Sequence, residues 1–416
     1  MTVFNDDMAR HGTIMVVFGL LAGAINYLFQ LAMGIMLTPA EYGTFYSLLS
    51  LLVILSFFSN TINTVVTKFI SIYKSNGMLE QFRFLWGYFT KRAVIISLVV
   101  FVVLMAMVPV ISDFLQVTNK WYVAILVFAL IFTLILPVNF GILRGLQRFI
   151  PLGLLNNLSA VFKLGFGVLL VGLGWGVYGG LIGFFLAQLL VLCASTLFLR
   201  DLIRVKSERV EVKELKSSLG LTLLVLSAFT IMSNIDVVLV KHYFSPEAVG
   251  SYSAISVLGK VAFIASGGIS VAMFPKTTET ANLGSSSQRI LWKALFLTLM
   301  ISGVVVLVYW LFSDFIVMVL FADKYTGISP HLVKYGIAMT FYAISYLLMH
   351  YSISLNHTKV AYTFTGTMVV QIFLIIVYHS SLAQVIDIMI ISGGLSIIST
   401  LPFCFRLGQK VPQRAI

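Results

Sequence analysis

Apolar segments long enough to cross a lipid bilayer follow one another along the whole chain. A membrane-spanning helix needs about 20 mostly apolar residues. Hydrophobic residues make up 59% of the sequence and charged residues 10%, whereas a soluble domain carries about 25% charged residues. Lipid must therefore solvate much of the protein. The predicted spans are 13–37, 44–70, 92–112, 121–143, 152–173, 177–199, 218–240, 248–273, 290–312, 331–354, 360–378 and 383–405.

A sequence repeat indicates that the chain consists of two related halves. Residues 37–45 and residues 244–252 share a proline, a glycine, hydroxyl residues and an aromatic residue in the same register, with Pro39 matching Pro246. Each copy follows one apolar span and precedes the next. A repeat at about half the chain length suggests a duplicated unit. Each half has six spans, an even number, so the two halves enter the membrane in the same orientation.

The predicted fold class is therefore an all-α integral membrane protein with about 12 transmembrane helices in two six-helix bundles. Two halves of equal orientation are expected to be related by a pseudo-two-fold axis along the membrane normal. The most charged stretch, residues 200–217, separates them. The predicted domains are residues 1–206 for the N-terminal bundle and residues 207–416 for the C-terminal bundle.

Basic residues are distributed unequally between the two sides of the predicted membrane. Twenty-one lysines and arginines fall on one side, whereas the opposite loops carry only Lys120, Lys241 and Lys324. Cytoplasmic loops carry the excess of lysine and arginine in membrane proteins, so both termini are predicted to be cytoplasmic and the protein to lie in the cytoplasmic membrane. The net charge of +12 is therefore attributed to topology, and no nucleic-acid partner is predicted.

The sequence lacks the signatures of several catalytic and cofactor sites. The fragment Gly259-Lys260 resembles the end of a phosphate-binding loop, but Ala254 stands where the upstream glycine belongs. The six histidines are scattered, and no HExxH motif occurs. The short external loops contain no paired acids and no basic cluster that could hold an activated sugar donor. We therefore predict a transporter rather than an enzyme, with no cofactor and no metal site.

Polar side chains deep inside the predicted spans are the candidate functional residues. A charge buried in a bilayer costs roughly 2.5–3.5 kcal/mol on insertion scales, so such residues are functional candidates by default. At a rise of about 1.5 Å per residue, Lys163 in the fifth span and Lys260 in the eighth lie near the midplane, one in each half. Together with four neutral side chains in the same layer they predict a weakly cationic substrate cavity between the halves. These are Asn26, Asn60, Gln188 and Gln371.

Structural interpretations of these residues also stay open. Asn and Gln inside a membrane often join helices by hydrogen bonds rather than bind a ligand, and a lysine can extend toward the interface. Asp236 lies a few residues from the outer end of the seventh span. It is a candidate site for a coupling cation or proton, and the alternative is a structural ion pair with Lys241.

The order of several motifs resembles the polysaccharide transporter family, the lipid-linked oligosaccharide flippases of the multidrug/oligosaccharidyl-lipid/polysaccharide (MOP) exporter superfamily. The resemblance covers nearly the whole chain and rests on the 6+6 plan and on four segments. It implies translocation of an undecaprenyl- or dolichyl-type lipid-linked saccharide from the inner to the outer leaflet by alternating access. The segments are 37–43, 173–180, Asn234-Ile235-Asp236 and 244–252.

The partners expected from this resemblance are the lipid-linked saccharide, membrane lipids and a proton or sodium ion, with the protein acting as a monomer. Two other function classes remain. A multidrug or organic-cation exporter of the same superfamily shares the fold but prefers acidic cavity groups. An integral-membrane polysaccharide polymerase or ligase needs a large external loop with catalytic charges, and the sequence has none.

Overall fold

The computed structural model describes residues 2–75, 82–203, 218–282, 286–325, 327–355 and 357–405. Within these ranges the chain forms helices and turns, and no β-strand is found. The prediction of an all-α membrane fold is confirmed. The predicted domain boundary between residues 206 and 207 lies outside the described residues. The chain divides into two compact units, Met1–Glu214 with Phe244–Gly250 and Leu215–Tyr243 with Ser251–Ile416.

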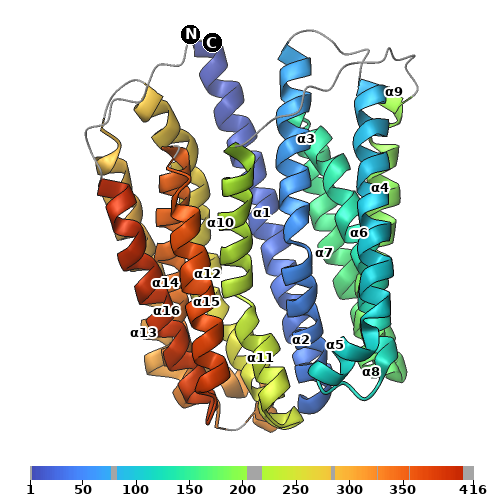
Figure 1. Ribbon diagram of the computed structural model, residues 1–416, viewed down its shortest axis with the longest axis vertical. Coiled ribbons are helices and arrows are strands. Elements are labelled where there is room, and N and C mark those ends of the chain that lie inside the picture. Colours follow the sequence, from blue (N-terminus) through green and yellow to red (C-terminus); the bar gives the residue numbers. More distant parts are fainter. Residues whose placement is uncertain are drawn as a thin grey trace. The chain divides into compact units, whose positions relative to one another are not determined.

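The first unit contains nine α-helices in its described part (Figure 1). Five of its helical stretches are long and apolar enough to cross a membrane, and one of them, Phe149–Leu197, contains both α7 and α8. A short π-helical turn, Val171–Trp175, links α7 to α8. The helices are α1 (Thr2–Met36), α2 (Pro39–Leu55), α3 (Phe57–Ser75), α4 (Phe82–Ala106), α5 (Val108–Phe114), α6 (Lys120–Gly145), α7 (Phe149–Leu170), α8 (Gly176–Leu197) and α9 (Arg200–Ile203).

The repeated motif forms the start of a helix in both of its copies. Thr38 caps α2 in a capping box, because its backbone N–H donates to the Glu41 carboxylate and its hydroxyl accepts from the Glu41 N–H. In the second copy the Ser245 hydroxyl accepts from the Ala248 N–H. A Cβ atom on Gly43 would lie 2.7 Å from the backbone nitrogen of Gly250, which belongs to the same compact unit. The repeated glycines are therefore required by close backbone packing.

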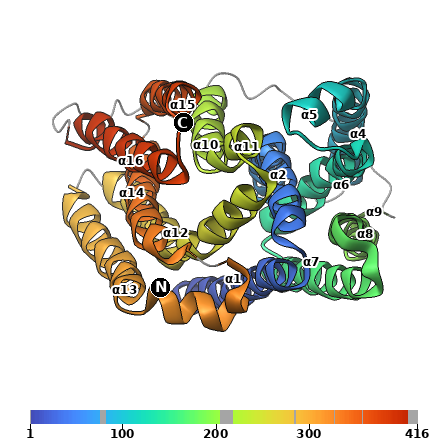
Figure 2. The ribbon, with the colours of Figure 1, turned by 90° about the horizontal axis from the view of Figure 1, so that it is seen from below.

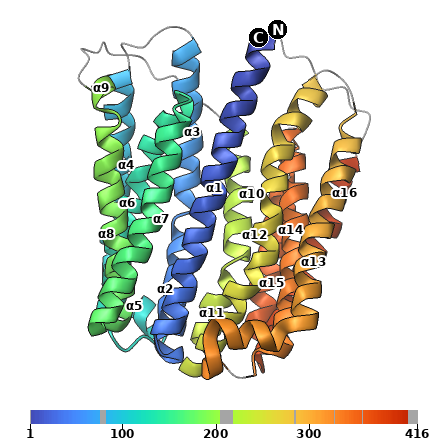
Figure 3. The ribbon, with the colours of Figure 1, turned by 180° about the vertical axis from the view of Figure 1, so that it is seen from behind.

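Helices α7 and α8 run antiparallel and pack through glycines, with α1 on the other side of α7 (Figure 3). The chain reverses at Gly174 and Gly176, whose φ angles are +87° and +50°, a conformation that favours glycine. A Cβ atom on Gly183 of α8 would lie 2.6 Å from the backbone nitrogen of Gly167 on α7. The single apolar stretch Phe149–Leu197 is therefore two crossings.

Replacing Gly183 by alanine is expected to lower the free energy of unfolding by roughly 1–3 kcal/mol, the usual cost of overpacking. The added methyl group would meet backbone atoms, which cannot rotate away. Gly165 on α7 is the matched control because a Cβ atom there meets nothing within 4 Å, and alanine should stabilise that helix by up to about 1 kcal/mol. Thermal unfolding in detergent measures both variants, and equal melting temperatures would contradict the packing assignment.

Basic side chains at one end of the first unit hold its turns together. Lys74 at the end of α3 donates to the Leu146 carbonyl oxygen at 3.0 Å, in the turn after α6. The Arg148 guanidinium pairs with the Asp201 carboxylate of α9 at 2.8 Å. The hydrogen bond from Arg148 lowers the pKa of Asp201 below its ordinary value. Both side chains are exposed, so this pair adds at most about 1 kcal/mol.

The second unit contains the other six candidate crossings, one of which is a broken helix. Helices α10 and α11 are bent by 41° at a short break and together form one crossing. Seen from the end of the bundle, α15 lies beside α10, and α14 lies beside α16 (Figure 2). The helices are α10 (Ser218–Met232), α11 (Ile235–Tyr243), α12 (Pro246–Asn282), α13 (Gln288–Phe321), α14 (Ser329–Ser354), α15 (Val360–Val377) and α16 (Leu382–Phe405), with a 3₁₀ turn at Ala322–Tyr325.

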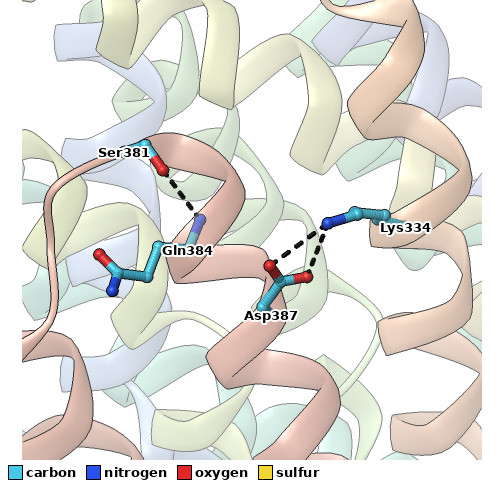
Figure 4. Close-up of polar contacts among 4 residues, drawn as sticks. All are labelled: Lys334, Ser381, Gln384 and Asp387. Carbon is cyan, nitrogen blue, oxygen red and sulfur yellow. Dashed lines mark hydrogen bonds and ion pairs between the residues drawn. The ribbon is translucent and has the colours of Figure 1, made fainter.

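An ion pair joins two helices of the second unit near their N-terminal ends (Figure 4). The Lys334 ammonium on α14 lies 3.0 and 3.3 Å from the two carboxylate oxygens of Asp387 on α16. At the start of α16 the Ser381 hydroxyl accepts from the Gln384 N–H. About half of each charged side chain is exposed. This pair therefore positions two helix ends and contributes little to stability.

The twelve predicted spans correspond to twelve helical crossings when α7 and α8 are counted separately and α10 with α11 as one. Several helices are longer than the predicted apolar spans. A helix can continue beyond the apolar segment into residues that are polar enough to leave the bilayer. Helix α4 begins at Phe82, α12 continues to Asn282, and α13 continues to Phe321 after a bend at Phe312. The pseudo-two-fold relation between the halves stays a prediction.

Candidate functional site

A lysine and an asparagine meet inside the first unit, where α7 packs against α1. The Lys163 ammonium of α7 donates a hydrogen bond to the side-chain oxygen of Asn26 on α1. The Asn26 amide nitrogen in turn donates to the Ala22 carbonyl oxygen at 2.7 Å, one turn earlier. This second bond fixes the amide so that its oxygen faces the lysine. The structure thus brings together two of the residues predicted from the sequence.

An aromatic ring on α8 lies near this lysine, and two buried amides lie one helical turn from its contact residues on α1 and α8. The Lys163 nitrogen lies 5.7 Å from the centre of the Phe184 ring on α8, within the range of a cation–π contact. Gln188 follows Phe184 by one helical turn and is buried. Its side-chain oxygen, and that of Gln30 on α1, are buried without a hydrogen-bond partner in the described part of the structure. Both oxygens can accept hydrogen bonds from hydroxyl groups.

The second unit holds a similar pair at the break between α10 and α11. The Lys260 ammonium of α12 donates to the side-chain oxygen of Asn234 at 3.1 Å. Asn234 lies in the break itself, and its amide nitrogen donates to the Thr230 carbonyl oxygen at 2.9 Å. A lysine is therefore bonded to an asparagine of the first crossing in each unit. The helix that supplies the lysine differs, being α7 in one unit and α12 in the other.

Asp236 lies in the first turn of α11 and is fully buried. One carboxylate oxygen accepts hydrogen bonds from the Tyr252 hydroxyl at 2.9 Å and from the Tyr335 hydroxyl at 3.0 Å. The other oxygen has no partner among the described residues. Lys260 also acts electrostatically on this carboxylate. No ion pair between Asp236 and Lys241 is found in the described ranges, so the structural alternative predicted for Asp236 is not present here.

One predicted site residue of the second unit, Gln371, takes part in neither pair and bonds a backbone carbonyl and a tyrosine instead. Gln371 of α15 is fully buried, and its amide nitrogen donates to the Met232 carbonyl oxygen at 3.0 Å. Its side-chain oxygen accepts from the Tyr342 hydroxyl at 2.9 Å. These contacts satisfy a carbonyl at the helix break, so they favour a packing role for Gln371. Asn60 lies in α3, and its side chain is outside the described part of the structure.

Three residues of the second-unit site were not predicted as site residues, although two lie in the motifs that carry the family resemblance. Asn234 is in the break of the first crossing, and Tyr252 and Tyr335 hold the Asp236 carboxylate. Tyrosines are frequent in membrane spans, so neither ring stands out in the sequence alone. Asn234 was detectable because an amide two residues before an intramembrane carboxylate is unusual in an apolar span.

The described residues contain no group of three or more His, Cys, Asp or Glu side chains that could hold a metal ion. The two lysine–asparagine pairs can instead bind an anion, because an ammonium carries three donors and a positive charge that the neutral amide does not offset. The Asp236 carboxylate can bind a proton or a small cation.

The fold is shared with known transporters. The lipid II flippase MurJ in an inward closed conformation aligns with a TM-score of 0.70 and 14% identity, over 93% of this chain and 87% of MurJ. An outward-facing multidrug resistance MATE family transporter of the MOP superfamily gives 0.62 and 15%, over 95% and 94%. The Vibrio cholerae MATE transporter VcmN gives 0.64 and 14%, over 97% and 95%.

The family is identified by the sequence itself. A search of curated proteins returned no match. Residues 32–330, which make up most of the chain and include both repeat motifs, match the family model described as polysaccharide biosynthesis protein. The all-helical fold and the shared architecture with MurJ agree with that match. The chain is therefore a multi-pass membrane protein that belongs to the polysaccharide biosynthesis protein family.

Proposed function

We propose that this protein is a flippase that moves a lipid-linked saccharide precursor across the cytoplasmic membrane by alternating access. The observation that carries the proposal is the lysine–asparagine pair inside each unit, Lys163 with Asn26 and Lys260 with Asn234. Intramembrane charges are rare and mark substrate pathways. A fold like that of the lipid II flippase and a family of polysaccharide biosynthesis proteins support this assignment.

The chemistry of the pairs fits a saccharide linked to a lipid through pyrophosphate. The two ammonium groups offset the negative charge of the phosphates through charge-assisted hydrogen bonds. The buried side-chain oxygens of Gln30 and Gln188 accept hydrogen bonds from sugar hydroxyls. The lipid tail stays in the bilayer while the head group crosses by alternating access, as in transporters built from repeats. Asp236 binds the coupling ion.

A multidrug exporter of the MOP superfamily is the second candidate, because solved MATE structures share the fold. An organic cation needs acidic groups in its site. In the described residues, Lys163 and Lys260 contribute two positive charges to the two sites and Asp236 a single carboxylate. The balance of charge therefore favours an anionic substrate.

The proposed function is tested by deleting the gene and measuring lipid-linked saccharide on each face of the cytoplasmic membrane. Deletion is expected to cause accumulation of the precursor in the inner leaflet and loss of the mature glycan, with both effects reversed by the wild-type gene. Sensitivity to cationic drugs with unchanged glycan export would instead support the multidrug exporter.

The orientation of the protein follows from its charges and is tested by cysteine labelling. In a background without Cys193 and Cys404, Arg200→Cys is expected to react only with membrane-permeant reagents, because the basic end of the first unit lies in the cytoplasm. Ser245→Cys, in the short turn between α11 and α12, should react with impermeant reagents added outside. Labelling of Arg200→Cys from outside would reverse the predicted topology.

A further inference from the structure

Lys260 stands between two negative groups if the proposed function is correct. One is the Asp236 carboxylate of its own unit, on which it acts electrostatically. The other is the anionic head group, which Lys260 is proposed to bind. Asn234, the hydrogen-bond partner of Lys260 at 3.1 Å, lies two residues before Asp236 at the same helix break. A charge change at Asp236 therefore acts directly on the lysine.

The surroundings of Asp236 allow its carboxyl group to exist in both charge states. Two tyrosine hydroxyls donate to one oxygen, which supports the ionised form. The other oxygen is buried without a partner among the described residues, so it can carry a proton. The neighbouring helices contribute further titratable and charged groups, and α15 and α16 contribute the neutral Gln371 and Met389 near this site. The titratable and charged groups are Tyr252 and Lys260 from α12 and Tyr335 and Tyr342 from α14.

We propose that the Asp236 carboxylate and the anionic head group compete for Lys260, so that protonation of Asp236 strengthens head-group binding. An ionised Asp236 offsets the lysine charge and weakens its attraction for a second anion. A protonated Asp236 leaves the full positive charge for the head group. Linkage is reciprocal, so a bound head group must also favour protonation of Asp236. This inference rests on the proposed function and adds a direct coupling between proton and substrate.

The first unit supplies the matched control. Lys163 is bonded to the neutral Asn26, and no acidic group in the described part of the chain forms an ion pair with it. Loss of Lys163 should therefore weaken head-group binding without altering how binding depends on pH. Loss of Lys260 should alter both.

The test measures binding of farnesyl-pyrophosphoryl-N-acetylglucosamine to the purified full-length protein in detergent, from about pH 5 to about pH 9. This probe is a short-tailed lipid-linked sugar whose two phosphates stay ionised throughout. Wild-type affinity should fall with rising pH by about 5- to 150-fold, the range of typical coupling between sites. Asp236→Asn should bind with the low-pH affinity at every pH. Lys260→Ala should bind weakly at every pH, Lys260→Arg should keep the pH dependence, and Lys163→Ala should bind weakly with the wild-type pH dependence.

The possible outcomes distinguish failure of the proposed coupling from failure of the proposed function. If the wild type binds the probe with an affinity that does not change with pH, the competition for Lys260 is wrong while the anion-binding flippase stands. If Asp236→Asn keeps the wild-type pH dependence, another group is responsible and the inference is likewise overturned. If the folded wild type does not bind the probe at any pH, both the inference and the proposed substrate class fail.

Discussion

Replacing Lys163 or Lys260 by alanine is expected to reduce affinity for a lipid-linked pyrophosphate about ten- to a hundredfold. A charge-assisted hydrogen bond from an ammonium to phosphate in a partly desolvated site contributes roughly 1.5–3 kcal/mol. Each lysine is partly buried and bonded to an asparagine. Expression should stay near normal, because removing a buried charge carries no desolvation cost. Binding of a short-tailed lipid-linked sugar and glycan export in a deletion strain measure the effect.

The controls for this prediction come from the same chain. Lys163→Arg and Lys260→Arg should be tolerated better than the corresponding glutamine variants, because the positive charge remains. Lys334→Ala removes a lysine that pairs with Asp387 at a half-exposed position, and it should leave affinity unchanged. Full glycan export by the Lys163→Ala/Lys260→Ala double variant would contradict the cationic site.

Replacing Asp236 by asparagine is expected to abolish the stimulation of transport by an ion gradient while leaving folding intact and substrate binding at the low-pH affinity of the wild type. Asparagine keeps an oxygen that accepts from Tyr252 and Tyr335, so the buried hydrogen bonds survive. It cannot take up a proton or supply a full negative charge. Transport into vesicles with and without an imposed gradient measures the effect. If the gradient stimulates the variant as much as the wild type, Asp236 is not the coupling site.

Lys241→Ala is the control for a structural ion pair with Asp236. Lys241 is buried, but no ion pair with Asp236 is found in the described ranges. The variant should therefore keep gradient-dependent transport. A defect equal to that of Asp236→Asn, accompanied by lower stability, would instead indicate that the two residues form a structural pair.

Hydropathy predicted the twelve crossings because bilayer thickness imposes a minimum length on every apolar helix. The breaks were harder to predict. The bend between α10 and α11 depends on the Met232 carbonyl finding partners in Gln371 and Tyr342, and those partners are more than 100 positions away in the sequence. Hydropathy carries no information about such long-range hydrogen bonds.

Only part of the candidate site was predicted, because long-range hydrogen bonds also decide which polar side chains meet. Depth along a helix identified Lys163, Asn26 and Lys260, because depth needs only residue counting. It could not distinguish an amide that meets a lysine from one that satisfies a carbonyl, as Gln371 does. The repeat offers an explanation. Pro39 and Pro246 are 207 residues apart, so Lys163 corresponds to a position next to Gln371. In this register α15 carries Val370 where α7 carries Lys163, and the lysine of the second unit lies on α12.

Flipping of a lipid-linked saccharide by this protein can be measured with purified protein in proteoliposomes. A fluorescent short-tailed lipid-linked sugar is placed in both leaflets, and a membrane-impermeant reagent quenches the outer-leaflet fraction. Wild-type protein is expected to bring nearly all of the probe within reach of the quencher over time. The Lys163→Ala/Lys260→Ala double variant should stay near protein-free liposomes, with only the outer half quenched. Equal quenching with wild-type protein and with protein-free liposomes would contradict flipping by this protein.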